Sequence, residues 1–306
     1  MRSCLALLLL VCFIQPSLAA DPPAVQAIKK KKGQFFFLYK GKPRVTYQFE
    51  NIKGGRPFFY DLLTSCGIKV TRNHPPKKGD DQDHPHHTGI FFTFGDLNGI
   101  DFWHLRGRVK FLGFDELIQV RGNTITFAVA CEYRSPDGKK QFLREITKHT
   151  ITLTKTKTII HYDVHLIGGR DGARIGTKEE GGLAGRVATP LAATSKKGGY
   201  LIDNHGRRGG QKVWGKQADW VDYRGRVKGK AVGLLMMTHP KNPNRCWWHA
   251  RDYGLFAANP FGPLNAKNKK TVLRPGKKLR LRYAVLVHED LPGKFDAKQA
   301  FADTFK

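Results

Sequence analysis

Residues 124–133 (TITFAVACEY) and 141–154 (QFLREITKHTITLT) indicate the fold class, because apolar and polar side chains alternate along both stretches. A period of two is typical of a β-strand that buries one face. Ser135-Pro136-Asp137-Gly138 lies between the two stretches and is a turn sequence. Residues 157–167 continue the alternation. Together these segments predict an antiparallel meander of long strands.

Short segments are expected in the rest of the chain, since 33 Gly and 16 Pro residues interrupt it. Alternation returns in residues 279–287, and Asn98-Gly99 between two apolar runs predicts a hairpin with a type I′ turn. Glycine-rich residues 168–185 and 204–216 are expected to form long loops. One helix is predicted after Asp296, because an apolar stripe follows a residue type that caps helices.

The expected architecture is therefore all-β: one large antiparallel β-sandwich domain over residues 34–306, with a short C-terminal helix. This two-sheet form resembles that of sugar-mutarotase-like domains. A composition of 40% hydrophobic and 11% aromatic residues excludes a mainly disordered chain. The basic segment 21–33 is expected to be a flexible tail before the domain.

Residues 1–20 are expected to be a cleaved signal peptide. Arg2 supplies a positive charge, Leu5 to Ile14 form an apolar run, and Ser17 to Ala20 offer a small-residue cleavage site. The apolar run is too short to span a bilayer. The sequence thus predicts a secreted or periplasmic protein with no membrane span.

Three cysteines follow residue 20, namely Cys66, Cys131 and Cys246. An odd number at wide spacing is no disulfide framework, although one bridge and one free thiol remain compatible with it.

Positive charge predominates in the mature chain. Without Arg2, 52 basic residues stand against 25 acidic ones, a formal charge of +27. Such a charge favours polyanionic partners or serves solubility alone. Zinc-finger spacing, an RNP motif and a basic helix are all absent, so nucleic acid is not an expected partner. An anionic polysaccharide or cell-envelope polymer is the expected polyanion.

Asp83-His84-Pro85-His86-His87 holds the densest chemistry in the sequence. Pro85 favours an extended His84, so His84 and His86 should point to one side and His87 to the other. His84 and His86, with the distant His249, are the predicted ligands of a divalent metal ion of unknown identity. Alternatively, a neutral imidazole of this cluster acts as a general base, or the cluster only caps and packs the next strand.

A second cluster, residues 246–254 (CWWHARDYG), combines aromatic and polar side chains. Aromatic faces beside polar groups suit sugar rings, whose apolar C–H faces are ringed by hydroxyls. The tryptophans either stack on a sugar ring or pack in the core. One carboxylate of the Glu179-Glu180 pair either acts as a general acid or ligand, or the pair belongs only to a solvated turn. The expected substrate-binding residues are Asp101, Asn204, Trp220 and Trp248.

Four stretches carry a resemblance to a known family: Asn73-His74-Pro75, DHPHHTGIFFTFGDLNGIDFW (83–103), VWGKQADWVDY (213–223) and WWHARDYGLFAANPFG (247–262). They resemble exported bacterial proteins labelled "methane oxygenase PmoA" or a domain of unknown function, over roughly residues 35–290. The resemblance implies a PmoA-like domain. Members of that family tend to resemble parts of bacterial systems that break down polysaccharides and glycosides. Where the family pattern has one Glu, this chain has Glu179-Glu180, which leaves open which carboxylate matches.

The leading functional hypothesis is an exported carbohydrate-active enzyme, a lyase or hydrolase acting on a sugar or glycoside. In it, a metal ion polarises the substrate, His87 or Glu180 moves a proton, and Arg251 neutralises developing negative charge. The alternative is a non-catalytic binder of an anionic glycan or cell-envelope polymer. A third hypothesis, a copper oxygenase, follows from the family label. The G-x-S-x-G, P-loop, dinucleotide-binding and H-E-x-x-H motifs are all absent.

Overall fold

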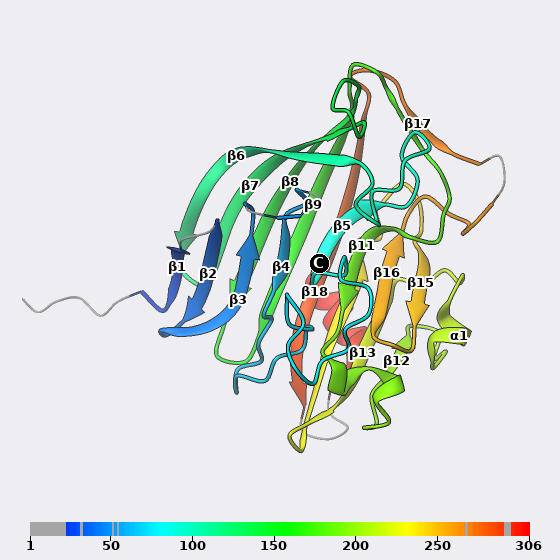
Figure 1. Ribbon diagram of the computed structural model, residues 1–306. Helices are drawn as coiled ribbons and strands as arrows, with labels where there is room; N and C mark the ends of the chain where they lie inside the picture. Colours follow the sequence, from blue (N-terminus) through cyan, green and yellow to red (C-terminus); the bar gives the residue numbers. More distant parts are fainter. Residues whose placement is uncertain (1–22, 31–32, 51, 54, 267–268, 291–294) are drawn as a thin grey trace, which may run out of the picture.

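A computed structural model describes residues 23–306, apart from 31–32, 51, 54, 267–268 and 291–294. Two large antiparallel sheets face each other in this part of the chain, so the predicted all-β sandwich is confirmed (Figure 1). The predicted signal peptide, residues 1–20, lies outside the described residues.

The first sheet has eight strands in the described chain. In spatial order they are β1 (Val25–Lys30), β2 (Gln34–Tyr39), β3 (Lys42–Gln48), β4 (Phe58–Tyr60), β5 (Ile90–Phe94), β11 (Gly181–Arg186), β16 (Leu255–Asn259) and β15 (Trp247–Arg251).

The second sheet also has eight described strands. Their order is β12 (Tyr200–Asp203), β13 (Trp220–Val227), β14 (Lys230–Thr238), β18 (Lys278–Asp290), β9 (Thr158–Gly168), β8 (Gln141–Leu153), β7 (Thr124–Arg134) and β6 (Arg108–Arg121). A small ribbon pairs β10 (Ala173–Ile175) with β17 (Thr271–Leu273). The α-helices of the described chain are α1 (Gly210–Val213) and α2 (Ala297–Thr304), and two 3₁₀-helices cover Thr189–Leu191 and Ala193–Ser195.

The predicted meander forms the centre of the second sheet. Strands β7, β8 and β9 are antiparallel neighbours, and β18 pairs with β9. Burial alternates along β9 as the sequence pattern requires, with every second residue buried. The alternation arises because successive side chains of a strand point to opposite faces of the sheet.

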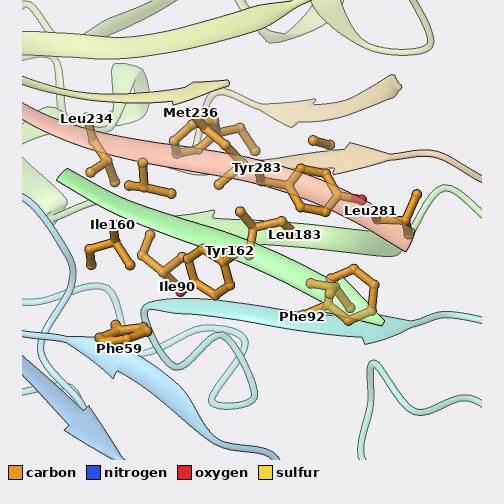
Figure 2. Packing of buried hydrophobic residues seen from close by; sticks show 14 of the residues in the cluster. Phe59, Ile90, Phe92, Ile160, Tyr162, Leu183, Leu234, Met236, Leu281 and Tyr283 are labelled. Atoms are coloured by element: carbon orange, nitrogen blue, oxygen red, sulfur yellow. The ribbon is translucent and has the colours of Figure 1, made fainter. Parts of the chain in front are cut away.

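The main hydrophobic core lies between the two sheets (Figure 2). Each large apolar side chain buried there contributes roughly 1.5–3 kcal/mol. The contacts across the interface involve Phe59, Ile90, Phe92 and Leu183 from the first sheet, and Ile160, Tyr162, Leu234, Met236, Leu281 and Tyr283 from the second.

Two expected irregular segments contain strands. Strand β1 takes Val25–Lys30 from the expected flexible tail and pairs with β2 at the sheet edge. Residues 168–185, expected to be a loop, contain β10 and the start of β11, which lies between β5 and β16. Gly182 has a φ of +76°, and a Cβ there would lie 2.0 Å from the carbonyl oxygen of Ala258. Glycine thus marks a close approach of two backbones at this point, rather than a loop.

Local predictions at the turn and the helix hold. Asn98 and Gly99 both have positive φ, at 54° and 81°, between the bridged residues Leu97 and Ile100. Asp296 caps α2 by accepting a hydrogen bond from the backbone N–H of Gln299. The helix packs on an apolar patch of the second sheet's outer face, which includes Trp220, Leu235, Met237, Ala284 and Leu286.

The three cysteines of the described chain are free: Cys131 and Cys246 are buried, and Cys66 is exposed. The bridge that the sequence left open is therefore not formed. Among the described residues, no helix combines the length and apolarity needed to cross a membrane.

Candidate functional site

A pocket with about 520 Å³ of open space brings together residues that are far apart in the sequence. It lies beside an apolar cluster that coats the outer face of the first sheet and includes Phe91, Trp103 and Leu255. The pocket is lined by His84, His87, Trp103, His104, Glu179, Glu180, His249, Arg251, Tyr253 and Leu255.

From Trp248 to Arg251, successive side chains of strand β15 point alternately into the core and into the pocket. His249 and Arg251 line the pocket, while the alternate residues Trp248 and Ala250 belong to the inter-sheet core. Trp248 is fully buried, and its indole N–H donates to the carbonyl oxygen of Ala218 at 3.0 Å. The expected stacking role of Trp248 is therefore wrong, because its ring faces away from the pocket.

Glu179 is the centre of a charge network in the pocket. Its Oε2 accepts from the Trp214 indole at 2.7 Å, and Arg251 Nη2 donates to Oε1 and Oε2 at 2.9 and 3.0 Å. The Nδ1 atom of buried His249 lies 3.3 Å from Oε2, although the angle falls short of a hydrogen bond. The approach of His249, then Trp214 and Arg251, lowers the pKa of Glu179 to about 2 and outweighs partial burial.

The histidine cluster forms a turn instead of the expected extended stretch. His84 has a φ of +44°, and the N–H of His87 donates to the carbonyl oxygen of His84 at 2.9 Å. The rings of His84 and His87 are parallel with centroids 4.9 Å apart, whereas His86 is nearly perpendicular to both. The predicted pairing of His84 with His86 on one side is therefore wrong, because Pro85 is accommodated by a left-handed His84.

Two buried arginines fix this turn. Arg72 donates to four backbone carbonyls, those of Asp81, Asp83, His84 and His87, and to the Asp83 carboxylate. Arg186 Nη2 donates to Asp83 Oδ1 at 2.7 Å. A guanidinium presents five donors in a planar fork, so it satisfies several carbonyls of a tight turn at once.

His87 lies between two donors inside the protein. The Trp103 indole N–H donates to its Nε2 at 3.1 Å, and Arg186 Nη1 lies 3.4 Å from its Nδ1. Burial, followed by His86 and Arg186, strongly lowers the pKa of His87. A ring in this position resists protonation, which disfavours the expected role of His87 as a general base.

The predicted metal ligands do not form a ligand set. His84 and His249 line the pocket but His86 does not. His84 Nδ1 lies 2.6 Å from Asp83 Oδ2, and His249 Nδ1 faces Glu179. Within the described part of the chain, no three His, Cys, Asp or Glu side chains are arranged to hold a metal ion. These residues therefore do not fit the expected divalent ion.

Of the other predicted residues, Glu180 lines the pocket and Asp101 lies next to it. Asp101 accepts from the backbone N–H of His104 and contacts its Nδ1 at 2.9 Å, so it orients a pocket residue. Asn204 is bonded to Asp219 within a loop, and Trp220 packs beneath α2. Neither lines the pocket, so their expected substrate contacts are not supported.

Sequence reasoning missed Trp103, His104 and Tyr253 as pocket residues. Trp103 and Tyr253 lie in stretches already singled out, and His104 directly follows one, but no periodicity links the three residues to the pocket. The ring of Tyr253 is nearly parallel to that of His84, with centroids 4.9 Å apart, and the Arg186 guanidinium lies over it. Trp103 and Tyr253 thus supply the aromatic walls that were assigned to Trp248 and Trp220.

Comparison with known proteins corrects the expected family. The matching family model, over residues 35–302, is "Family of unknown function (DUF6807)". The predicted PmoA-like membership is therefore wrong, and the copper oxygenase hypothesis, which followed from that label, falls with it. None of the curated proteins matches this chain.

Two solved structures are similar to this chain. One is a galactose mutarotase-like protein from Lactobacillus casei ATCC 334, with 11% identity, a TM-score of 0.45 and coverage of 86% of this chain and 100% of that one. The other is a galactose mutarotase related enzyme from Lactobacillus acidophilus, with 9% identity, a TM-score of 0.37 and coverage of 86% and 97%. What the comparisons establish is that this chain belongs to the family of unknown function DUF6807.

Proposed function

We propose that the pocket binds a sugar or glycoside and moves a proton on it by general acid–base chemistry. The carrying observation is that Glu179 gathers His249, Arg251 and Trp214 beside two aromatic walls. Polar groups that converge between aromatic faces suit a ring with hydroxyls on its edge and C–H groups on its faces.

His249 is the proposed proton carrier in place of His87. A carboxylate beside Nδ1 favours the tautomer with its proton on that atom, which leaves Nε2 able to accept a proton. Glu179, with its pKa near 2, stays ionised at neutral pH and maintains this orientation. Arg251 keeps the Glu179 charge compensated and stacks on Trp214, with 5.5 Å between guanidinium carbon and ring centroid.

Glu180 supplies a second group for proton transfer. It lines the same pocket, and none of the described residues bonds to its carboxylate. A base and an acid are both needed to cleave a glycosidic bond by hydrolysis or elimination. Lyase and hydrolase chemistry are thus the proposed reactions, in an exported protein as the first twenty residues predict.

A screen of oligosaccharides with product analysis tests this proposal. The variants are His249→Ala and, as a matched control, His165→Ala, whose ring is 40% exposed on β9 away from the pocket. We expect turnover to fall about 10²–10⁴-fold in His249→Ala and to be unchanged in the control. An unsaturated product identifies a lyase, and a new reducing end without unsaturation identifies a hydrolase. Full activity in His249→Ala would remove the proposed mechanism.

The net positive charge favours a second candidate, non-catalytic binding of an anionic glycan. It uses surface charge and leaves the pocket histidines without a role. The two candidates therefore differ in their dependence on salt and on His249.

A further inference from the structure

An internal cavity lies in the core between the sheets, separate from the pocket. The volume that the centre of a water molecule can occupy in this cavity is about 20 Å³. By the same measure, a cavity needs roughly 10–15 Å³ to hold one water. Its lining is unusually polar for a core and includes Tyr47, Arg56, Glu145, His149 and Tyr162.

Four polar atoms at this cavity have no hydrogen-bond partner among the described residues. They are Tyr47 Oη, Arg56 Nη1, His149 Nδ1 and Tyr162 Oη. Their side chains are between 1% and 4% exposed, so bulk water does not reach them. Buried polar groups in native proteins are nearly always bonded to protein or to ordered water. Four unpaired atoms around one cavity therefore indicate a missing partner within it.

Arg56 and Glu145 both line the cavity without touching each other. Burial raises the pKa of Glu145, and its hydrogen bonds from Thr147 and Tyr133, together with the positive charge of Arg56, oppose that rise. Glu145 accepts hydrogen bonds from Tyr133 Oη and Thr147 Oγ1, both at 2.7 Å. Among the described contacts, Arg56 and Glu145 form no direct ion pair. Burial lowers the pKa of Arg56 to about 10, so this side chain is still charged at neutral pH. A buried charge needs compensation, and here it must come across the cavity.

We propose that this cavity is a built hydration site, in which ordered water bridges Arg56 Nη1 to the Glu145 carboxylate. The donors and acceptors balance. Water accepts from the guanidinium and the Tyr162 hydroxyl, and donates to the carboxylate and to another acceptor such as His149 Nδ1. A simple ion fits less well, because Arg56 repels cations and Glu145 repels anions.

The site also connects the core to the histidine turn. The other amino group of Arg56, Nη2, donates to the carbonyl oxygen of His86 at 2.7 Å, and the guanidinium stacks over Phe91 at 4.0 Å. Arg56 is thus a positioning residue: one end is held by the bridging water, and the other fixes the backbone beside His87.

A crystal structure at a resolution that shows ordered water tests the hydration site directly. The variants are Tyr162→Phe and the matched control Tyr283→Phe, a buried tyrosine of the same sheet that does not line the cavity. We expect water in the wild-type protein and in Tyr283→Phe, and loss or weakening of that water in Tyr162→Phe. An empty wild-type cavity, a direct Arg56–Glu145 contact, or undiminished water in Tyr162→Phe would overturn the proposal.

Hydrogen exchange in solution tests the link to the turn. Arg56→Lys keeps the charge, but one ammonium cannot reach both the water and the His86 carbonyl. In Arg56→Lys we expect the backbone amides of residues 83–88 to exchange several-fold faster than in the wild-type protein. In Arg44→Lys we expect their exchange to be unchanged. Arg44 is a buried arginine that bonds to the carbonyls of Thr154 and Lys155 instead. Equal exchange of residues 83–88 in the two variants would contradict the positioning role of Arg56.

Discussion

At the scale of single residues, Glu179 determines the electrostatics of the pocket. It contacts the imidazole of His249 and the guanidinium of Arg251, both on β15, and the indole of Trp214 from a second segment of the chain. A partly buried carboxylate without partners would be costly, but these three partners stabilise its charged form. The same contacts make the stability of the protein sensitive to acid.

The first prediction concerns Glu179→Gln and pH. Because the pKa of Glu179 falls from 4.5 to about 2 on folding, its charge stabilises the fold above pH 4.5, and that contribution is lost as pH falls toward 2. The full effect is at most about 3 kcal/mol. Denaturant unfolding between pH 2.5 and 7 should show a shallower loss of stability in Glu179→Gln than in the wild-type protein. If the unfolding free energies of the two proteins fall equally with pH, the pKa of Glu179 is not lowered by folding.

At the scale of elements, strand β11 carries the site, because Glu179 and Glu180 precede it directly. The glycine-rich sequence Gly181-Gly182 led to the expectation of a loop. Close packing explains these glycines instead, since strand β16 passes where a side chain would be. Sequence alone does not distinguish a glycine needed for flexibility from one needed for contact.

The second prediction tests this explanation with Gly182→Ala. The added Cβ meets the Ala258 carbonyl oxygen at 2.0 Å and also requires a positive φ. We expect a loss of unfolding free energy well above about 1 kcal/mol in urea titrations. Gly206→Ala is the control, because Gly206 has a similar φ of +75° with nothing within 4 Å. If both variants lose the same unfolding free energy, the positive φ alone accounts for the effect and the contact with Ala258 does not contribute.

The third prediction concerns α2 and its cap. Asp296→Ala removes the acceptor for the Gln299 N–H and should lower the unfolding free energy by about 1 kcal/mol. Asp303→Ala, at the other end of the helix, should have a smaller effect, because an acid near a helix C-terminus is not favoured by the dipole. A cap variant as stable as the wild-type protein in urea would contradict this role of Asp296.

At the scale of the whole molecule, the net positive charge and the pocket are separate features. The excess of 53 basic over 25 acidic residues acts over the surface, whereas the pocket depends on a few side-chain contacts within it. Surface charge interacts through solvent and is screened by salt. Retention of the protein by an anionic polymer therefore reports on the surface.

The fourth prediction uses this difference. Retention on immobilised polygalacturonate should weaken steeply as salt rises above about 0.1 M, where the Debye length is near 10 Å. His249→Ala should be retained like the wild-type protein, and a neutral glucan column should retain neither at low salt. Retention that is insensitive to salt but abolished in His249→Ala would place anionic-glycan binding in the pocket.

The fold class was predictable because the strand signal is local. Alternation along residues 124–133, 141–154 and 157–167 specifies which face of each strand is buried, and the meander follows from the turns between them. The same pattern could not show that β11 lies between β5 and β16, because that pairing joins segments far apart in the chain.

The site was predictable only in part. Residue types identified His84, His249, Glu180 and Arg251, which do line one pocket. Residue types could not show that Trp248 faces the core, since this depends on which side of β15 meets the second sheet.

By itself, then, the sequence determined the strands of the meander, their buried faces and the capped helix, because each depends on neighbours within a few residues. Only the tertiary structure decided that His249 meets Glu179, that Arg72 and Arg186 bend the histidine cluster into a turn, and that Glu145 and Arg56 share a core cavity. These contacts form between strands and turns distant in sequence, so no local pattern of residues specifies them.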